Sequence, residues 1–153
     1  MEITIRKAGI ESLPLLMEWR MRVLREVFAD YQEVDWETLR ANNEAYYREQ
    51  LAGGGHTACF ACDQTGAVIG CGGICYQLEM PSPDNISGTC GYLMNIFALP
   101  EVRGQGVGRK IVDFLIADAR ARQTEKIYLE SSEIALHMYE RIGFTPMQDY
   151  YKL

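Results

Sequence analysis

Apolar positions in the first third of the chain follow one strand period and then two helical periods. Apolar and polar residues alternate over residues 2–6, which predicts a strand. Apolar side chains then recur every three or four positions over residues 12–29, which predicts an amphipathic helix capped by Ser12. A second helix is expected over residues 36–51, with Asp35 as its cap and three consecutive glycines at its end.

The middle of the chain is rich in residues that favour strands. Residues 57–62 and 67–78 are two such segments, and the polar, glycine-containing turn between them predicts a hairpin. Residues 80–88 carry prolines, Asp-Asn and a glycine, and are expected to form a surface loop. A further strand is predicted over residues 89–99, and Pro100 ends it because proline has no N–H to donate to a sheet.

The last third returns to alternating helices and strands. A helix is expected to begin inside a glycine-rich loop, followed by a strand over residues 126–130 and a helix over residues 133–142 that Gly143 terminates. Residues 144–153 can supply one or two closing strands. The predicted order is β-α-α-β-β-β-α-β-α-β-(β), an α/β fold with a mixed sheet in a single domain over residues 1–153.

Composition and charge narrow the class of protein. With 48% hydrophobic and 24% charged residues, the chain is expected to fold rather than to stay disordered. A formal charge of −6 argues against a nucleic-acid partner, which requires a basic face. No apolar run approaches the roughly 18 residues that span a bilayer, and no secretory signal is visible. We therefore expect a cytoplasmic protein with no membrane partner.

Negative charge is concentrated in residues 26–50, which hold seven acidic residues and two basic ones. Such a cluster is either a solvated helix face or a source of negative potential that attracts a cationic acceptor.

The five cysteines do not predict a disulfide framework, because their number is odd and no export signal is present. Cys59 and Cys62 form a C-x-x-C, but within a strand two residues three apart face opposite ways and cannot share a metal. We expect small buried thiols and no metal site.

The segment from Arg103 to Gly108 carries the most specific chemistry. A predicted strand passes through this glycine-rich turn directly into a helix, whose first N–H groups have no partner within the helix. Glycines let those donors curl around a phosphate, and Arg109 and Lys110 add positive charge. The spacing does not fit a dinucleotide fingerprint, and no hydroxyl follows Lys110 as a Walker loop requires. The pattern indicates a pyrophosphate site, with a simple tight turn as the alternative.

Two segments resemble motifs of the GNAT superfamily of N-acetyltransferases. The first is similar to the family's [Arg/Gln]-x-x-Gly-x-[Gly/Ala] motif, and the second to its A-x-x-x-Tyr-x-x-x-Gly-Phe segment. They read Arg103-Gly104-Gln105-Gly106-Val107-Gly108 and Ala135-Leu136-His137-Met138-Tyr139-Glu140-Arg141-Ile142-Gly143-Phe144. The order of predicted elements also agrees from end to end, so the resemblance covers the whole chain and implies a GNAT-like fold that binds acetyl-coenzyme A (acetyl-CoA).

The resemblance implies how the chain holds this co-substrate. Backbone groups before the glycine loop would pair with the pantetheine arm, the loop amides would hold the pyrophosphate, and the N–H near Ala98 would face the thioester oxygen. Many relatives carry Asn where this chain has Ser132, which can still cap the last helix and reach the co-substrate. The implied binding residues are Ile96, Phe97, Ala98, Arg103, Gly104, Gln105, Gly106, Val107, Gly108, Arg109 and Ser132.

Two catalytic residues follow from the same resemblance. Tyr139 matches the tyrosine that protonates the departing thiolate, although an aromatic on the buried stripe of the last helix is the alternative. Glu130 is the expected base that removes a proton from the amine, and it could equally be a solvated strand end. Asn95 and Glu79 are rivals for that role.

The implied reaction is direct attack of an amine on the thioester of acetyl-CoA, with no metal. The acceptor is expected to be a cationic small-molecule or peptide amine, and its identity stays open. A homodimer and a longer acyl group also stay open. A catalytically silent acyl-CoA binding or sensing domain is the alternative, and a nucleotide-phosphate enzyme is a weaker third hypothesis.

Overall fold

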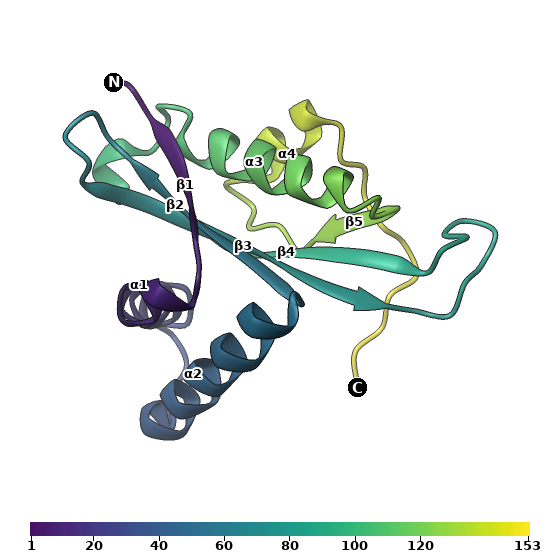
Figure 1. Cartoon of the computed structure of the whole chain (residues 1–153), viewed down its shortest axis with the longest axis horizontal. Helices are drawn as coiled ribbons and strands as arrows, with labels where there is room; N and C mark the ends of the chain where they lie inside the picture. Colours follow the sequence, from purple (N-terminus) through teal and green to yellow (C-terminus); the bar gives the residue numbers. More distant parts are fainter.

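A five-stranded sheet in the order β1-β2-β3-β4-β5 forms the middle layer of the computed structural model, which describes residues 1–153 (Figure 1). Neighbouring strands are antiparallel except for β4 and β5, which are parallel. The strands are β1 (Thr4–Ala8), β2 (His56–Cys62), β3 (Val68–Leu78), β4 (Thr89–Ala98) and β5 (Lys126–Leu129).

Helices cover both faces of the sheet, two on each side (Figure 1). The helices α1 (Leu13–Val27) and α2 (Trp36–Gly53) lie on one face, and α3 (Val107–Ala121) and α4 (Leu136–Ile142) lie on the other. Short 3₁₀ turns precede α1 and α3, at Ile10–Ser12 and Pro100–Val102. None of the helices combines the length and the apolar character that crossing a bilayer requires.

The sheet separates two apolar cores because successive strand residues point to opposite faces. Phe60 of β2 packs with Trp19 of α1 in the core on one face, whereas its neighbour Cys59 packs with Ile111 of α3 in the core on the other. Cys62 lies on the Phe60 side, so Cys59 and Cys62 face opposite ways, as the strand period predicted.

The cysteines are free thiols, and all except Cys75 are buried. Burial raises the pKa of Cys59 to about 12, so this thiol is a protonated packing group. No group of three or more His, Cys, Asp or Glu side chains is placed to share a metal ion.

Two sequence expectations near the C-terminus need correction. No strand follows α4: residues 144–153 run as irregular chain, where Pro146 has no N–H to donate and Asp149 has a left-handed φ of 65°. The last helix starts at Leu136 rather than at residue 133, because residues 133–135 form a turn. The mixed α/β fold itself is confirmed.

Candidate active site

The sheet opens between β4 and β5. Their parallel pairing ends at Leu93 and Leu129, whereas β4 continues to Ala98. Past this point β4 is paired only with β3 on its other side. We call this gap the β4–β5 opening.

Backbone amides of β4 point into the β4–β5 opening. The N–H of Leu99 donates to the carbonyl of Ile69 in β3 at 2.9 Å. Because N–H groups alternate sides along a strand, the N–H groups of Ile96 and Ala98 face away from β3, where no strand pairs with them. A pantetheine arm, which carries amides of its own, could pair with this edge as an added strand.

A bulge bends β4 where the opening starts. Asn95 has a left-handed φ of 60°, and the register between β3 and β4 shifts between Cys71 and Gly73. Asparagine tolerates this conformation better than most side chains. The bulge turns the strand away from β5 and puts the Asn95 side chain on the α1–α2 face, where it accepts a hydrogen bond from Arg20.

The glycine loop, residues 103–108, leads from the end of β4 into α3. Gly104 and Gly106 have left-handed φ values of 80° and 87°, a conformation that glycine adopts without the strain other residues incur. None of the six backbone N–H groups from Gly104 to Arg109 donates a hydrogen bond within the chain. Lys110 is the first residue of α3 whose N–H bonds back, to the carbonyl of Gly106 at 3.1 Å.

These six unpaired donors lie at the N-terminus of a 15-residue helix, an arrangement that suits an anion such as a pyrophosphate. Gly108 lies close to α4: a Cβ there would be 3.3 Å from the Met138 sulfur, a tight contact with the end of a flexible side chain. The close approach brings α4, and with it Tyr139, next to the glycine loop.

The two arginines at the glycine loop are paired with carboxylates, whereas Lys110 donates to the carbonyl of Ile3. Arg103 forms an ion pair with Glu26 of α1 at 2.9 Å and donates to the carbonyl of Ala98 at 3.0 Å. Arg109 pairs with Asp113, one turn further along α3, at 3.0 Å. The free donors of this loop are therefore mainly backbone amides.

Tyr139 is buried on the inner side of α4, with only 6% of its surface exposed. Its ring packs edge-on against the ring of Phe144, with 5.8 Å between the ring centroids. Its hydroxyl makes no hydrogen bond within the chain. Burial raises the pKa of Tyr139, so the phenol keeps its proton at neutral pH. The residue lines a pocket of about 1020 Å³ between β5, α4 and the C-terminal segment, which we call the β5 pocket.

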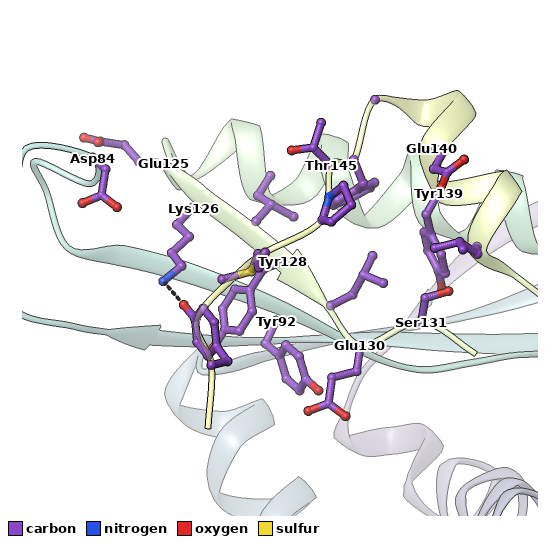
Figure 2. Close-up of a pocket in the computed structure, with 18 of the residues that line it drawn as sticks. Asp84, Tyr92, Glu125, Lys126, Tyr128, Glu130, Ser131, Tyr139, Glu140 and Thr145 are labelled. Atoms are coloured by element: carbon purple, nitrogen blue, oxygen red, sulfur yellow. Dashed lines mark hydrogen bonds between the residues drawn. The ribbon is translucent and has the colours of Figure 1, made fainter. Parts of the chain in front are cut away.

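Glu130 follows β5 and lies in the same pocket as Tyr139. Figure 2 shows its carboxylate and the Tyr92 hydroxyl of β4 directed toward each other. Burial raises the pKa of Tyr92, and the negative charge of Glu130 raises it further. Glu79 lies elsewhere, paired at 3.1 Å with Lys126 at the start of β5, so only Glu130 and Asn95 of the three candidate bases lie at the opening.

Ser132 lies in the turn before α4. Its hydroxyl oxygen accepts a hydrogen bond from the N–H of Ala135 at 3.3 Å, immediately before the helix begins. Ser132 therefore does not cap α4 as expected: the N-cap is Ala135, which has no side-chain cap, and the Ser132 contact lies within the turn that precedes the helix.

A second pocket lies on the α1–α2 face of the sheet, and sequence reasoning missed it. We call this cavity of about 280 Å³ the α2 pocket. It is lined by Arg20, Asn42, Asn43, Tyr46, Tyr47, His56, Cys75, Met94 and Asn95. The sequence assigns a possible catalytic role only to Asn95 among these residues, because they come from two helices and three strands and no local motif links them.

Tyr46, His56 and Cys75 form a hydrogen-bonded network in the wall of the α2 pocket. The Tyr46 hydroxyl lies 2.8 Å from Nδ1 of His56 and 2.9 Å from the sulfur of Cys75. His56 is 7% exposed, and burial together with the positive charge of Arg20 lowers its pKa to about 4. The imidazole is therefore neutral at pH 7.

The acidic residues of the 26–50 segment line neither pocket. Glu26 pairs with Arg103, Glu44 pairs with Arg48, and Asp35 accepts from the N–H of Thr38 as the cap of α2. Part of this charge thus stabilises the fold, and any action on an acceptor would be at long range.

Two known acetyltransferases are similar to this chain in sequence. Glucosamine 6-phosphate N-acetyltransferase of Trypanosoma brucei brucei is 28% identical over 88 residues, a match that covers 58% of each chain. This chain thus spans less than two thirds of that relative. YjgM, an uncharacterized N-acetyltransferase of Escherichia coli strain K12, is 29% identical over 129 residues, which is 80% of this chain and 72% of the relative.

Solved structures share the fold. A predicted acetyltransferase from Clostridium acetobutylicum, solved with acetyl-CoA, superposes with a TM-score of 0.88 at 24% identity, over 99% of this chain and 96% of its own. The family model described as the acetyltransferase (GNAT) family matches residues 16–144, which include the β4–β5 opening, the glycine loop and Tyr139. The chain belongs to the GNAT acetyltransferase family.

Proposed function

We propose that the chain is a single N-acetyltransferase domain that moves an acetyl group from acetyl-CoA to an amine. The observation that carries this proposal is the run of six unpaired amides, Gly104–Arg109, at the end of an opening edged by the free amides of Ile96 and Ala98. This geometry fits a pyrophosphate followed by an amide-bearing arm. Acetyl-CoA supplies the activated acetyl group.

Each remaining part of the reaction falls to a named group of this chain. Glu130 accepts a proton from the acceptor's ammonium, which is cationic when it arrives and must be neutral to attack. The N–H of Ala98 donates to the thioester oxygen as negative charge develops on it. Tyr139 donates its proton to the sulfur as the carbon–sulfur bond breaks and the carbon–nitrogen bond forms. The attacking nitrogen loses a second proton as the amide forms. That proton restores Tyr139 through solvent, and Glu130 releases its own proton to solvent, so the net products are the amide, the coenzyme A thiol and one proton.

The α2 pocket is the proposed acceptor site. It meets the opening at Asn95, so an amine bound in it lies beside the β4 edge that would hold the thioester. The trypanosomal relative acts on an amino sugar, which supports an amine as acceptor.

Thiol release from acetyl-CoA tests the proposal. We expect time-dependent release that requires both the chain and an amine, with the acetylated amine detected by mass spectrometry. Binding of acetyl-CoA with no release across a broad panel of primary amines would instead support the silent acyl-CoA binding domain.

A further inference from the structure

Arg20 is the only charged side chain that lines the α2 pocket. Its Nε donates to Oδ1 of Asn43 at 2.9 Å, and its Nη1 donates to Oδ1 of Asn95 at 3.1 Å. A guanidinium has five N–H donors, so three remain without a partner in the chain. Both oxygens that hold it belong to neutral amides, which leaves its charge unbalanced.

The surroundings of Arg20 differ from those of the other ten arginines. Arg48, Arg103, Arg109 and Arg122 each lie within 3.4 Å of a carboxylate, whereas no carboxylate lies within 4.0 Å of Arg20. The remaining arginines also lack a carboxylate, but none of them lines the α2 pocket: Arg6, Arg22 and Arg25 lie over aromatic rings, and Arg40, Arg120 and Arg141 are exposed. The positive charge of Arg20 acts across the pocket, because it lowers the pKa of His56 and opposes the burial that raises the pKa values of Tyr46 and Cys75. The α2 pocket is therefore a small site of positive potential in a chain of formal charge −6.

The guanidinium is also held in place. Asn43 donates from Nδ2 to the carbonyl of Leu39 at 2.8 Å, which turns its Oδ1 toward Arg20. Asn95 is fixed by the β4 bulge. A planar fork fixed on one edge presents its remaining N–H groups in the geometry that carboxylates and phosphates accept.

We propose that Arg20 binds an anionic group of the acceptor, so that the substrates are small amines that also carry a carboxylate or a phosphate. This inference rests on the proposed function and names the class of its acceptor. The volume of about 280 Å³ fits a small molecule of this kind, and the anion held by Arg20 orients the amine toward the opening at Asn95. Asn43 and Asn95 are positioning residues for the guanidinium.

Matched pairs of amines test this class of acceptor. The carboxylate arm compares free amino acids with their carboxamides, and the phosphate arm compares glucosamine 6-phosphate with glucosamine and phosphoethanolamine with ethanolamine. We expect kcat/KM to favour the anionic member of at least one arm by roughly 10- to 100-fold, the range expected for hydrogen bonds to a charged group. The arm that shows the preference identifies the anion.

Three variants separate Arg20 from a general effect of charge. Arg20→Gln should bring the anionic-to-neutral ratio close to 1, and Arg20→Lys should retain only part of it because the fork is lost. Arg40→Gln removes an exposed cation of α2 outside the pocket and should leave the ratio unchanged. A wild-type preference for the neutral amines, or a ratio that survives in Arg20→Gln, overturns the inference while leaving acetyl transfer established.

Direct binding gives an answer even if no amine is acetylated. The anionic amines should raise the Tm of the wild type and of Arg40→Gln, but not that of Arg20→Gln. The Tm without ligand checks that each variant folds. The absence of any shift in the wild type across both arms also overturns the inference.

Discussion

The β4–β5 opening and the α2 pocket meet at Asn95, but they are built from different atoms. The opening and its glycine loop present backbone N–H groups, while nearby cations such as Arg103 and Arg109 are paired with carboxylates. The α2 pocket presents side chains, among them Arg20 of α1, Tyr46 of α2 and His56 of β2.

This difference indicates which half of the site can change while the fold persists. A backbone site survives most substitutions, provided that glycine remains where φ is left-handed, so one co-substrate can be kept across many sequences. A side-chain site can be altered one residue at a time. The comparison therefore predicts a constant donor and a variable acceptor within this fold.

The largest expected effect is on the chemical step between the two regions. Tyr139→Phe keeps the ring that packs against Phe144 but removes the proton donor, so we expect kcat to fall by about 10²–10⁴-fold. Because the hydroxyl makes no hydrogen bond within the chain, Tm and acetyl-CoA affinity should stay nearly constant. Single-turnover kinetics with thermal denaturation measure both.

Near-full activity in Tyr139→Phe, with chemistry rate-limiting, would mean that the residue only packs and that water protonates the thiolate. A large loss of Tm would instead indicate a structural hydroxyl.

The next effect concerns the side-chain network of the α2 pocket. His56 takes up its proton near pH 4 in the folded chain but near pH 6.5 when unfolded. The unfolded state therefore binds more protons between these values, and stability falls as the pH drops from 6.5 to 4, by up to about 3 kcal/mol. Urea unfolding of the wild type and His56→Gln across this range should show a difference in ΔG that shrinks toward low pH.

His137 provides the matched control, because its side chain is 80% exposed on α4. His137→Gln should reproduce the wild-type profile. If His56→Gln also reproduces it, His56 is not held neutral by burial.

The smallest expected effect is on the backbone side. Arg109 is about half exposed and already paired with Asp113. The Arg109→Gln substitution should therefore raise the Kd for acetyl-CoA by no more than about fivefold. Isothermal titration calorimetry measures this change. A loss of 100-fold or more would show that side chains, rather than amides, hold the pyrophosphate.

The contrast between a backbone site and a side-chain site also explains which parts of the fold and of the candidate site the sequence predicts. The order from β1 to α4 and the start of α3 followed from local periodicity and from glycines, which act on their own neighbours. The contacts of Arg20 with Asn43 and Asn95 span 23 and 75 residues and arise only when α1, α2 and β4 pack together. The closing strands expected over residues 144–153 do not form. Within this segment Pro146 has no N–H to donate to a sheet, and the backbone of Asp149 has a left-handed φ. The Tyr139 and Glu130 roles stay predictions.

The central claim is that the glycine loop binds acetyl-CoA through its backbone, and a pair of glycine variants tests it most directly. Gly106 and Gly66 have the same φ of 87° and open space around the position of a Cβ, but Gly66 lies in the β2–β3 turn. Valine at either site should destabilise the chain by a similar amount through backbone strain. Acetyl-CoA at 100 times its Kd should stabilise the wild type and Gly66→Val by about 2.7 kcal/mol. We expect no such stabilisation of Gly106→Val, and an undiminished shift in that variant would contradict the account.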